Sequence, residues 1–252
     1  MFTHAITRKP GMNFAQGITA SKHESPNYEL IQKQHEAYIS ALKSLGLEVA
    51  VLDSLPDYPD AYFVEDTAVV TPEIAVITNP GAQARNGEQK SVAPVLAQYR
   101  KIARINPPGT IDGGDVLIAG LFCFIGISER TNSEVAHQLK MILENYGYTC
   151  MPIPVSAGLH LKSSVNFAGQ DLLLITSDYA SRPEFNKFEK IVVDKTESYA
   201  SNSLWINDTL IIPAGFPKTN AYLTSAGFSI IELDISEARK MDGGLTCMSI
   251  RF

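Results

Sequence analysis

Gly243-Gly244-Leu245-Thr246-Cys247-Met248-Ser249-Ile250-Arg251-Phe252 ends the chain and delivers a cysteine to the start of an apolar strand. The same design, polar residues leading into a short apolar strand, recurs at residues 63–70, 112–118, 159–162 and 198–206. These segments lie roughly 40 to 50 residues apart, a period typical of repeat or propeller-like arrays. Repeats arranged around one axis would bring Asp66, Asp112, His160 and Cys247 together.

The stretches between these segments predict α/β units. We expect helices near residues 28–45, 89–100, 133–146 and 218–226, because apolar residues recur at helical spacing in the first and third of these, which Gly46 and Gly147 follow. Short apolar runs predict strands at residues 49–52, 74–78, 101–105, 121–126, 172–175 and 209–213. Each unit then has the order strand, strand, helix, strand. Two-residue turns join the paired strands, which distinguishes the units from a wholly parallel, doubly wound sheet.

Composition narrows the class of protein. With 252 residues and 45% hydrophobic content the chain can bury a sizeable core, and no linker divides it, so we expect a single domain over residues 1–252. A net charge of −6 argues against a nucleic-acid partner. The three cysteines have no paired spacing, and neither a signal peptide nor a membrane-spanning run is present. We therefore expect a soluble, cytoplasmic protein with no membrane partner.

Cys247 and His160 are the candidate reactive pair. A free cysteine is more often a small buried hydrophobic residue, and an isolated histidine is more often a hydrogen-bonded core residue. A cysteine near a histidine is, however, the usual way to activate a thiol and to return a proton to a leaving group. Cys123 and Cys150 lie in apolar surroundings and are interpreted as packing residues. Residues 11–27, rich in glycine and polar side chains, are interpreted as a lid or binding loop.

Charged residues accompany this pair. Alternation along the strand predicted at residues 63–70 would turn one of Glu65 and Asp66 inward and the other away. A buried carboxylate needs a partner or a cationic ligand, and a structural salt bridge is the simpler explanation. A tight turn explains both aspartates of Asp112-Gly113-Gly114-Asp115. Arg85 and Arg130 follow strands at equivalent places; each could be solvated, whereas both together would clamp a carboxylate.

Taken together, these motifs resemble those of the dimethylarginine dimethylaminohydrolases, guanidine-modifying enzymes of the pentein superfamily, which has a five-bladed α/β-propeller fold. The matching segments, in the order of the family, are Phe63-Val64-Glu65-Asp66, Pro80-Gly81-Ala82-Gln83-Ala84-Arg85, Asp112-Gly113-Gly114-Asp115-Val116, Arg130-Thr131-Asn132, Leu159-His160-Leu161-Lys162 and Asp242-Gly243-Gly244-Leu245-Thr246-Cys247. The resemblance implies hydrolysis of Nω-methylated arginines to citrulline and methylamines through a covalent thiouronium on cysteine, with no cofactor and no metal.

The resemblance also implies a role for each site residue. Cys247 is expected to be the nucleophile, His160 the general acid and base, and Asp112 the carboxylate that orients His160, where bacterial relatives often carry glutamate. The expected substrate contacts are Asp66 with Glu65 for the guanidinium, Arg85 and Arg130 for the α-carboxylate, and Asp60 with the backbone carbonyls of Ile18 and Met241 for the α-amino group. Family members include dimers, so a homodimer is one alternative for the assembly.

Other activities remain open from the sequence. An arginine deiminase would use the same residue types, but deiminases of this superfamily typically place an aspartate two residues after the histidine, where this chain has Lys162. An amidinotransferase would need a second amine acceptor. A non-catalytic binding protein of the same fold would have no need of a cysteine, a histidine, three carboxylates and two arginines at strand starts. Zinc could inhibit by binding Cys247 and His160.

Overall fold

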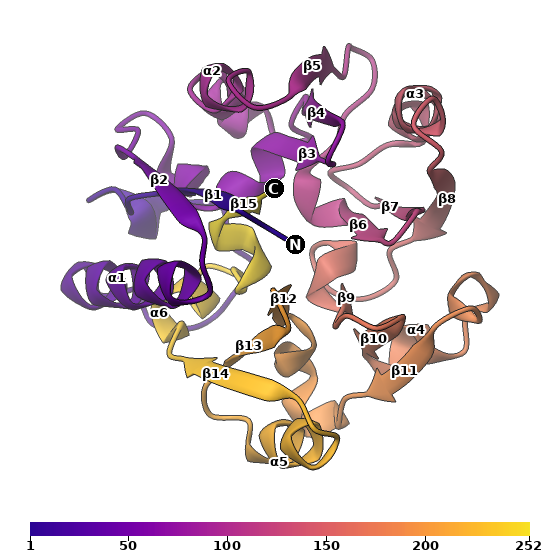
Figure 1. Cartoon of the computed structure of the whole chain (residues 1–252). Coiled ribbons are helices and arrows are strands. Elements are labelled where there is room, and N and C mark those ends of the chain that lie inside the picture. The colour runs from indigo at the N-terminus through magenta and orange to yellow at the C-terminus, as the bar shows by residue number, and fades with distance from the viewer.

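Five three-stranded sheets surround a central axis in the computed structural model, which describes all 252 residues (Figure 1). The sheets, each given from its inner strand outward, are β15 (Ile250–Arg251), β1 (His4–Arg8) and β2 (Glu48–Leu52); β3 (Ala68–Val70), β4 (Ile74–Ile77) and β5 (Lys101–Arg104); β6 (Val116–Ala119), β7 (Phe122–Ile127) and β8 (Thr149–Pro154); β9 (Val165–Phe167), β10 (Leu172–Ile175) and β11 (Glu189–Val192); β12 (Leu204–Ile206), β13 (Thr209–Pro213) and β14 (Ser229–Leu233). The chain is thus a five-bladed α/β-propeller, as the sequence predicts.

Every blade has the same connectivity. The inner and middle strands pair antiparallel, and the middle and outer strands pair parallel, as β6, β7 and β8 do with Cys123 opposite Cys150. A parallel pair requires a crossover, and in the larger blades a helix supplies it. The predicted order of strand, strand, helix, strand is therefore confirmed.

The first blade closes the ring, because it is built from both ends of the chain. The C-terminal strand β15 pairs antiparallel with the N-terminal strand β1, with Ala5 opposite Arg251 and Ile6 opposite Ile250. Both termini consequently lie near the axis (Figure 1). This closure fixes the segment that carries Cys247 to the rest of the propeller.

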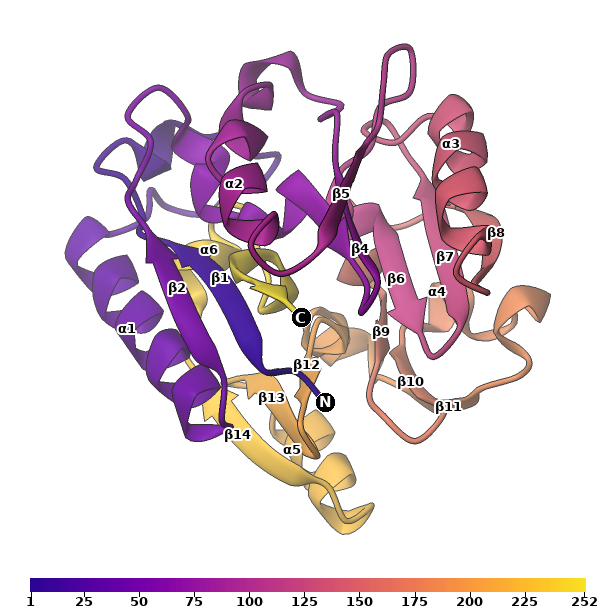
Figure 2. The same cartoon turned by 45° about the horizontal axis from the view of Figure 1, so that its top comes forward.

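The helices vary in length, and α1, α2, α3 and α5 lie at the rim (Figures 1 and 2). They are α1 (Tyr28–Ser44), α2 (Ala93–Leu96), α3 (Ser133–Glu144), α4 (Ser177–Ala180), α5 (Pro217–Ser225) and α6 (Ser236–Arg239). The side chains of Asn27 and Asn132 accept hydrogen bonds from Leu30 and Val135 and so cap α1 and α3. The helix predicted at residues 89–100 is wrong in length: it is the single turn of α2, preceded by a 3₁₀ turn over Glu88–Lys90.

The polar segments before the inner strands also differ from the prediction. The strand expected at residues 63–70 comprises only β3, and a 3₁₀ turn over Val64–Thr67 precedes it. Similar turns precede β6 (Gly113–Asp115), β9 (Leu161–Ser163), β12 (Lys195–Ser201) and β15 (Thr246–Met248). Because a 3₁₀ turn does not alternate its side chains as a strand does, both Glu65 and Asp66 are buried, at 3% and 4% exposure. The expectation that one of these two carboxylates turns away from the interior is wrong.

The hydrophobic core is divided into five clusters between neighbouring blades and their helices. The largest includes Tyr38 and Leu42 of α1 together with Leu245 and Met248, so α1 packs against the segment around Cys247. Cys123 and Cys150 lie in the cluster under α3, in agreement with a packing role. No helix of the structure has the length and apolar character needed to span a membrane.

Candidate active site

The 3₁₀ turns converge at one end of the central axis, and the sequence-predicted residues converge with them. Asp60, Asp66, Arg85, Asp112, Arg130, His160, Cys247, Ile18 and Met241 all line one small cavity. Glu65 lines an adjoining cavity that also contains His160 and Cys247. The repeat therefore brings residues from all parts of the chain to one place, as the sequence predicts.

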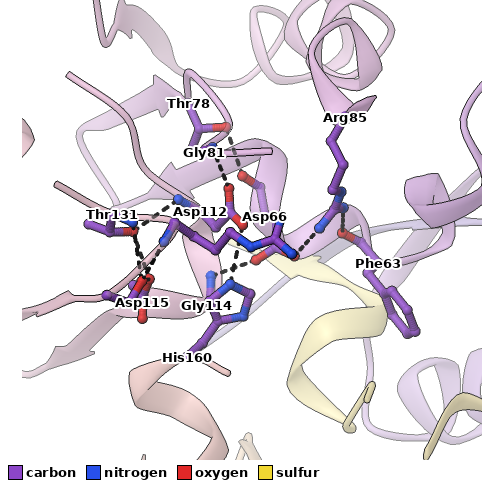
Figure 3. Close-up of polar contacts among 12 residues, drawn as sticks. Phe63, Asp66, Thr78, Gly81, Arg85, Asp112, Gly114, Asp115, Thr131 and His160 are labelled. Atoms are coloured by element: carbon purple, nitrogen blue, oxygen red, sulfur yellow. Dashed lines mark hydrogen bonds and ion pairs between the residues drawn. The ribbon is translucent and has the colours of Figure 1, made fainter. Parts of the chain in front are cut away.

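His160 and Asp112 form a buried pair. His160 begins the turn before β9, Asp112 precedes the turn before β6, and their Nε2 and Oδ2 atoms lie 3.2 Å apart (Figure 3). Burial alone would lower the pKa of His160, but the carboxylate of Asp66, the hydrogen bond to Asp112 and the charge of Asp115 raise it to about 9. The raised pKa favours the imidazolium form of His160 at neutral pH.

Asp66 is held beside this pair by the backbone of the next blade. Its Oδ1 accepts a hydrogen bond from the backbone N–H of Gly114 at 2.8 Å (Figure 3). A Cβ at Gly114 would lie 2.5 Å from Nδ1 of His160 and 2.9 Å from Oδ1 of Asp66. Only glycine allows these two side chains to come so close to the backbone, which gives the Gly-Gly pair of this motif a physical reason.

Cys247 lies in the turn before β15 and is partly accessible from both cavities. Burial, followed by the negative charges of Glu65 and Asp66, raises the pKa of its thiol to about 12. The free site therefore holds a protonated thiol next to an imidazolium. An added positive charge near the carboxylates would shift the balance toward thiolate.

Glu65 forms ion pairs with two buried cations beside the site, Lys162 and Arg251. Its Oε1 accepts hydrogen bonds from Nζ of Lys162 at 2.6 Å and from the guanidinium of Arg251 at 2.9 Å. Its Oε2 is buried without a partner. Glu65 and Lys162 also line a separate cavity of about 640 Å³ among the inner strands, so this ion pair separates the two spaces.

Arg85 is not solvated, contrary to the simplest expectation for a loop arginine. Its guanidinium donates to Oδ2 of Asp66 at 2.6 Å, to the carboxylate of Glu88 and to the backbone carbonyls of Asp60 and Phe63. These contacts orient Asp66 and engage most of the donors of Arg85. Arg130, by contrast, lines the cavity and makes no side-chain hydrogen bond or ion pair within the protein.

The residues expected at the α-amino group surround the far end of the small cavity. Both carboxylate oxygens of Asp60 accept a hydrogen bond from the backbone N–H of Ile18, at 3.0 and 3.1 Å. The backbone carbonyls of Ile18 and Met241 accept none within the protein. The cavity has a volume of about 30 Å³, close to that of one water molecule, so an amino acid requires it to widen.

The predicted lid contacts the rim of this cavity. Oδ2 of Asp242 accepts hydrogen bonds from the hydroxyl of Thr19 at 2.8 Å and from the backbone N–H of Ala20 at 2.7 Å. Asp242 has a positive φ of 60°, an uncommon conformation for a residue other than glycine. Through Asp242 the lid is tied to the segment that carries Cys247.

Sequence reasoning missed two buried carboxylates that position site residues. Asp115, fully buried, accepts a hydrogen bond from the hydroxyl of Thr131 (Figure 3). It also accepts hydrogen bonds from the hydroxyl of Ser128 and from the backbone N–H of Leu161, the residue after His160. Glu88 holds Arg85. Asp115 lies in a motif that a tight turn explains equally well. For Glu88, the spacing of three residues from Arg85 is a local signal that could have indicated the pair.

Three potential metal ligands are close together. Atoms of Asp66, Asp112 and His160 lie within 4.8 Å of one another, whereas the sulfur of Cys247 does not belong to this group. A metal would have to displace the proton on His160 and its pairing with Asp112. Zinc inhibition through Cys247 and His160 stays a prediction.

Comparison with known proteins agrees with this arrangement. A family model described as N,N dimethylarginine dimethylhydrolase, eukaryotic, matches residues 9–251. The N(G),N(G)-dimethylarginine dimethylaminohydrolase of Pseudomonas aeruginosa is 39% identical over the full length of both chains, and that of Streptomyces coelicolor is 34% identical over 98% of this chain and 96% of its own.

Solved structures give the same result. A cysteine-to-serine variant of the Pseudomonas aeruginosa enzyme in complex with citrulline superposes with a TM-score of 0.98 at 38% identity, covering all of both chains. The N-terminal domain of ArgZ, an arginine dihydrolase from cyanobacteria, has a TM-score of 0.88 at 16% identity over 98% of this chain and 97% of that chain, which shows a shared fold. This chain belongs to the dimethylarginine dimethylaminohydrolase family.

Proposed function

We propose that Cys247, His160 and Asp112 are the groups with which this chain hydrolyses Nω-methylated arginines to citrulline and methylamines. The observation that carries the proposal is one shared cavity in which a thiol, a charged imidazole paired with a carboxylate, and the carboxylate of Asp66 meet. The family membership and the citrulline complex of the Pseudomonas aeruginosa relative support the same reaction.

The positive charge of the substrate guanidinium favours the thiolate form of Cys247. In this proposal Asp66 and Glu65 receive the guanidinium, Arg130 with the remaining donor of Arg85 receives the α-carboxylate, and Asp60 with the carbonyls of Ile18 and Met241 receives the α-amino group. The guanidinium neutralises the carboxylates that raise the pKa of Cys247, so the thiolate forms when substrate binds. The small cationic amino acid is therefore both substrate and activator.

The chemistry follows in two halves. The thiolate adds to the guanidinium carbon, and His160, charged at neutral pH, gives its proton to the departing methylamine, which leaves a thiouronium on Cys247. The neutral imidazole then accepts a proton from water as the water adds to the same carbon. Loss of the thiolate releases citrulline. Asp112 keeps the imidazole in one orientation through both halves.

Lys162 favours alkylated substrates. An arginine deiminase binds both terminal nitrogens of its substrate with two carboxylates. In this chain Lys162 occupies the position of the second carboxylate, and its Nζ lies 2.6 Å from Oε1 of Glu65. A methylated nitrogen has fewer hydrogens to donate, so the absence of the second carboxylate costs it less binding energy than it costs an unmethylated nitrogen. We therefore expect kcat/KM for dimethylarginine and monomethylarginine to exceed that for arginine.

The test is a citrulline assay with mass detection on dimethylarginine, monomethylarginine and arginine. We expect formation of citrulline and the matching methylamine from the methylated substrates, and loss of turnover in Cys247→Ser. The Cys123→Ser variant is the matched control, because Cys123 is a buried cysteine outside the site. Equal or faster turnover of arginine would reject the substrate assignment, and full activity of Cys247→Ser would reject the mechanism.

A cytoplasmic location and a homodimeric assembly are also part of this proposal. They rest on the composition and on the family, and cell fractionation and light scattering test them directly.

A further inference from the structure

A large cavity lies on the axis, on the side of the Glu65 ion pair that faces away from Cys247. It measures about 640 Å³, and residues of all five inner strands line it, namely β3, β6, β9, β12 and β15. Figure 1 shows these strands around the axis, with both termini near it. This axial cavity shares only Glu65 and Lys162 with the cavity that contains His160 and Cys247. The proposed reaction therefore leaves it unused.

We propose that the axial cavity is a second ligand site, which binds an organic monocarboxylate with an apolar chain of about six to ten carbons. The carboxylate would lie at the inner end of the cavity, against Lys162 and Arg251, and the chain would lie along the inner strands toward the open end. Neither cation is one of the groups assigned to the substrate, so this site is distinct from the substrate site.

The inner end of the axial cavity is positively charged. Nζ of Lys162 and the guanidinium of Arg251 lie 2.6 and 2.9 Å from the same oxygen of Glu65, so two cations share one carboxylate. Both cations line the cavity, and their side chains remain 11% and 13% exposed. The other charged lining residues are exposed, namely Asp208 and the amino-terminal Met1. Because guanidinium and ammonium groups form strong hydrogen bonds with carboxylates, an anion of this type fits the excess of positive charge.

The wall between the two ends suits an apolar chain. Thirteen of the 26 lining residues are hydrophobic. Those on the inner strands include Val70, Leu117, Ile118, Phe167, Leu204 and Trp205. Water against these side chains is released when a hydrocarbon chain takes its place, which favours binding. Cations at one end and hydrocarbon along the wall together select an amphipathic anion, whereas an uncharged hydrocarbon or a small polar ion matches only one of the two.

The volume of the axial cavity agrees with a ligand of this size. A volume of about 640 Å³ is the space of about twenty water molecules, and it lies within the range of about 300–1,000 Å³ that is usual for ligand pockets. Octanoate has about ten heavy atoms and would fill about half of this space. A chain of this length therefore enters without any widening of the ring of inner strands.

Occupancy of this site would act on the proposed reaction through Glu65, which lines both spaces. The charge of Glu65 raises the pKa of Cys247, and the charge of Lys162 lowers it. A carboxylate bound at Lys162 offsets the effect of the lysine, so the thiolate becomes less favourable. We therefore expect the ligand to lower kcat without competing with substrate. This consequence rests on the proposed function, whereas binding itself does not.

The experiment follows the fluorescence of Trp205, which is the only tryptophan of the chain and lines the axial cavity. The wild type is titrated with octanoate, and with octanol and octylamine, which have the same chain length but no charge or the opposite charge. Arg251→Gln removes one cation from the inner end. Val70→Phe narrows the cavity from β3, and Val51→Phe is its matched control, because Val51 is an exposed valine of β2 outside the cavity.

We expect octanoate to change the fluorescence of Trp205 in a saturable way. Octanol should bind about ten- to a hundredfold more weakly, because it lacks the hydrogen bonds between charged groups, and octylamine should not displace octanoate. Arg251→Gln should weaken octanoate binding about tenfold or more, and Val70→Phe should do the same by filling the space, whereas Val51→Phe should have no effect. Bound octanoate should lower kcat for dimethylarginine and leave KM within about twofold.

A fluorescence that does not respond to octanoate, or that responds equally to octanol, would overturn the proposal and leave the cavity to water. Equal affinity of Val70→Phe and Val51→Phe would exclude the axial cavity as the place of binding. A raised KM with unchanged kcat would place octanoate at the α-carboxylate contacts of the substrate instead, and binding with no effect on either constant would overturn the coupling through Glu65. Loss of all turnover of dimethylarginine would reject the proposed function, and the fluorescence titration would still decide whether the ligand site exists.

Discussion

Replacing Asp112 by asparagine tests the pair at the centre of the site. The Oδ1 atom of Asp112 accepts a hydrogen bond from the backbone N–H of Gly81 at 3.1 Å, and Oδ2 faces Nε2 of His160 at 3.2 Å. In Asp112→Asn the oxygen keeps its bond to Gly81, so an amide N–H points at Nε2. Two N–H groups cannot face each other without cost, and the imidazolium is disfavoured.

The magnitude follows from the pKa of His160. It is raised from 6.5 to about 9 although burial acts in the opposite direction, and Asp112 contributes both a hydrogen bond and a charge to the rise. A neighbouring opposite charge shifts a pKa by about 1–3 units. His160 must be protonated to release the amine, so the alkaline limb of kcat/KM should move from near pH 9 in the wild type to about pH 6–8 in the variant. The value of kcat should fall by about 10²–10⁴-fold, as when a histidine loses the carboxylate that orients it.

The assay is the release of citrulline from dimethylarginine between pH 5.5 and 10, read at saturating and at low substrate. Thr131→Val is the control, because it removes the hydrogen bond that the backbone N–H of Asp112 donates to the hydroxyl of Thr131, and the bond from that hydroxyl to Asp115, but leaves both carboxylates in place. Its alkaline limb should not move. The reasoning is refuted by an Asp112→Asn protein whose alkaline limb stays near pH 9 and whose kcat lies within about threefold of the wild type.

Three further predictions concern the thiol, the missed aspartate and the stability of the fold. With a pKa of about 12, Cys247 of the free protein should react with iodoacetamide about tenfold faster for each pH unit between 7 and 10, after subtraction of the Cys247→Ser rate; a plateau below pH 9 contradicts this. Asp115→Asn should lower the free energy of unfolding in urea by about 2–4 kcal/mol because three hydrogen bonds converge on the carboxylate. Ser128→Ala removes only one of these three, together with the two bonds that its hydroxyl accepts from the backbone N–H groups of Arg130 and Thr131, and should cost about 1–2 kcal/mol; equal midpoints for the two variants speak against this role. The raised pKa of His160 contributes about 3 kcal/mol to stability below pH 6.5, the pKa of histidine in the unfolded chain, and this contribution is lost as pH rises to 9. The difference in the free energy of unfolding between wild type and His160→Gln should therefore shrink over that interval. A constant difference would show that His160 is not the source of the contribution.

The sequence predicts the ring and the gathering of the site, because both follow from periodicity. Polar residues before each inner strand recur with the blade repeat, and a ring of blades necessarily brings them to one end of the axis. The local form of these segments does not follow. Phe63 and Val64 favour a strand, but Glu65 and Asp66 both need buried partners, and the 3₁₀ turn that satisfies them depends on Arg85, Lys162 and Arg251 from distant segments.

Partners of buried charges are likewise set by tertiary structure. Lys162 distinguishes this chain from arginine deiminases in the sequence, yet only the structure shows that it neutralises Glu65. Arg85 is a reasonable carboxylate ligand by its position, yet Glu88 and Asp66 already engage it. Spacing indicates where a charged residue lies, whereas the groups that it contacts come from other blades.

The balance of these charges explains why the free site can be stable and still respond to substrate. Six buried carboxylates lie in or beside the site, Asp60, Glu65, Asp66, Glu88, Asp112 and Asp115, and the cations that face them are Arg8, Arg85, Arg130, Lys162, Arg251 and His160. Burial, followed by the charges of Glu65 and Asp66, opposes ionisation of Cys247, which keeps the sulfur a thiol and makes it a poor target for other electrophiles. In the proposed reaction, a guanidinium bound between the carboxylates offsets their part of that opposition. Reactivity of the sulfur is therefore coupled to the presence of a cation of the right shape, and specificity and activation arise from the same contacts.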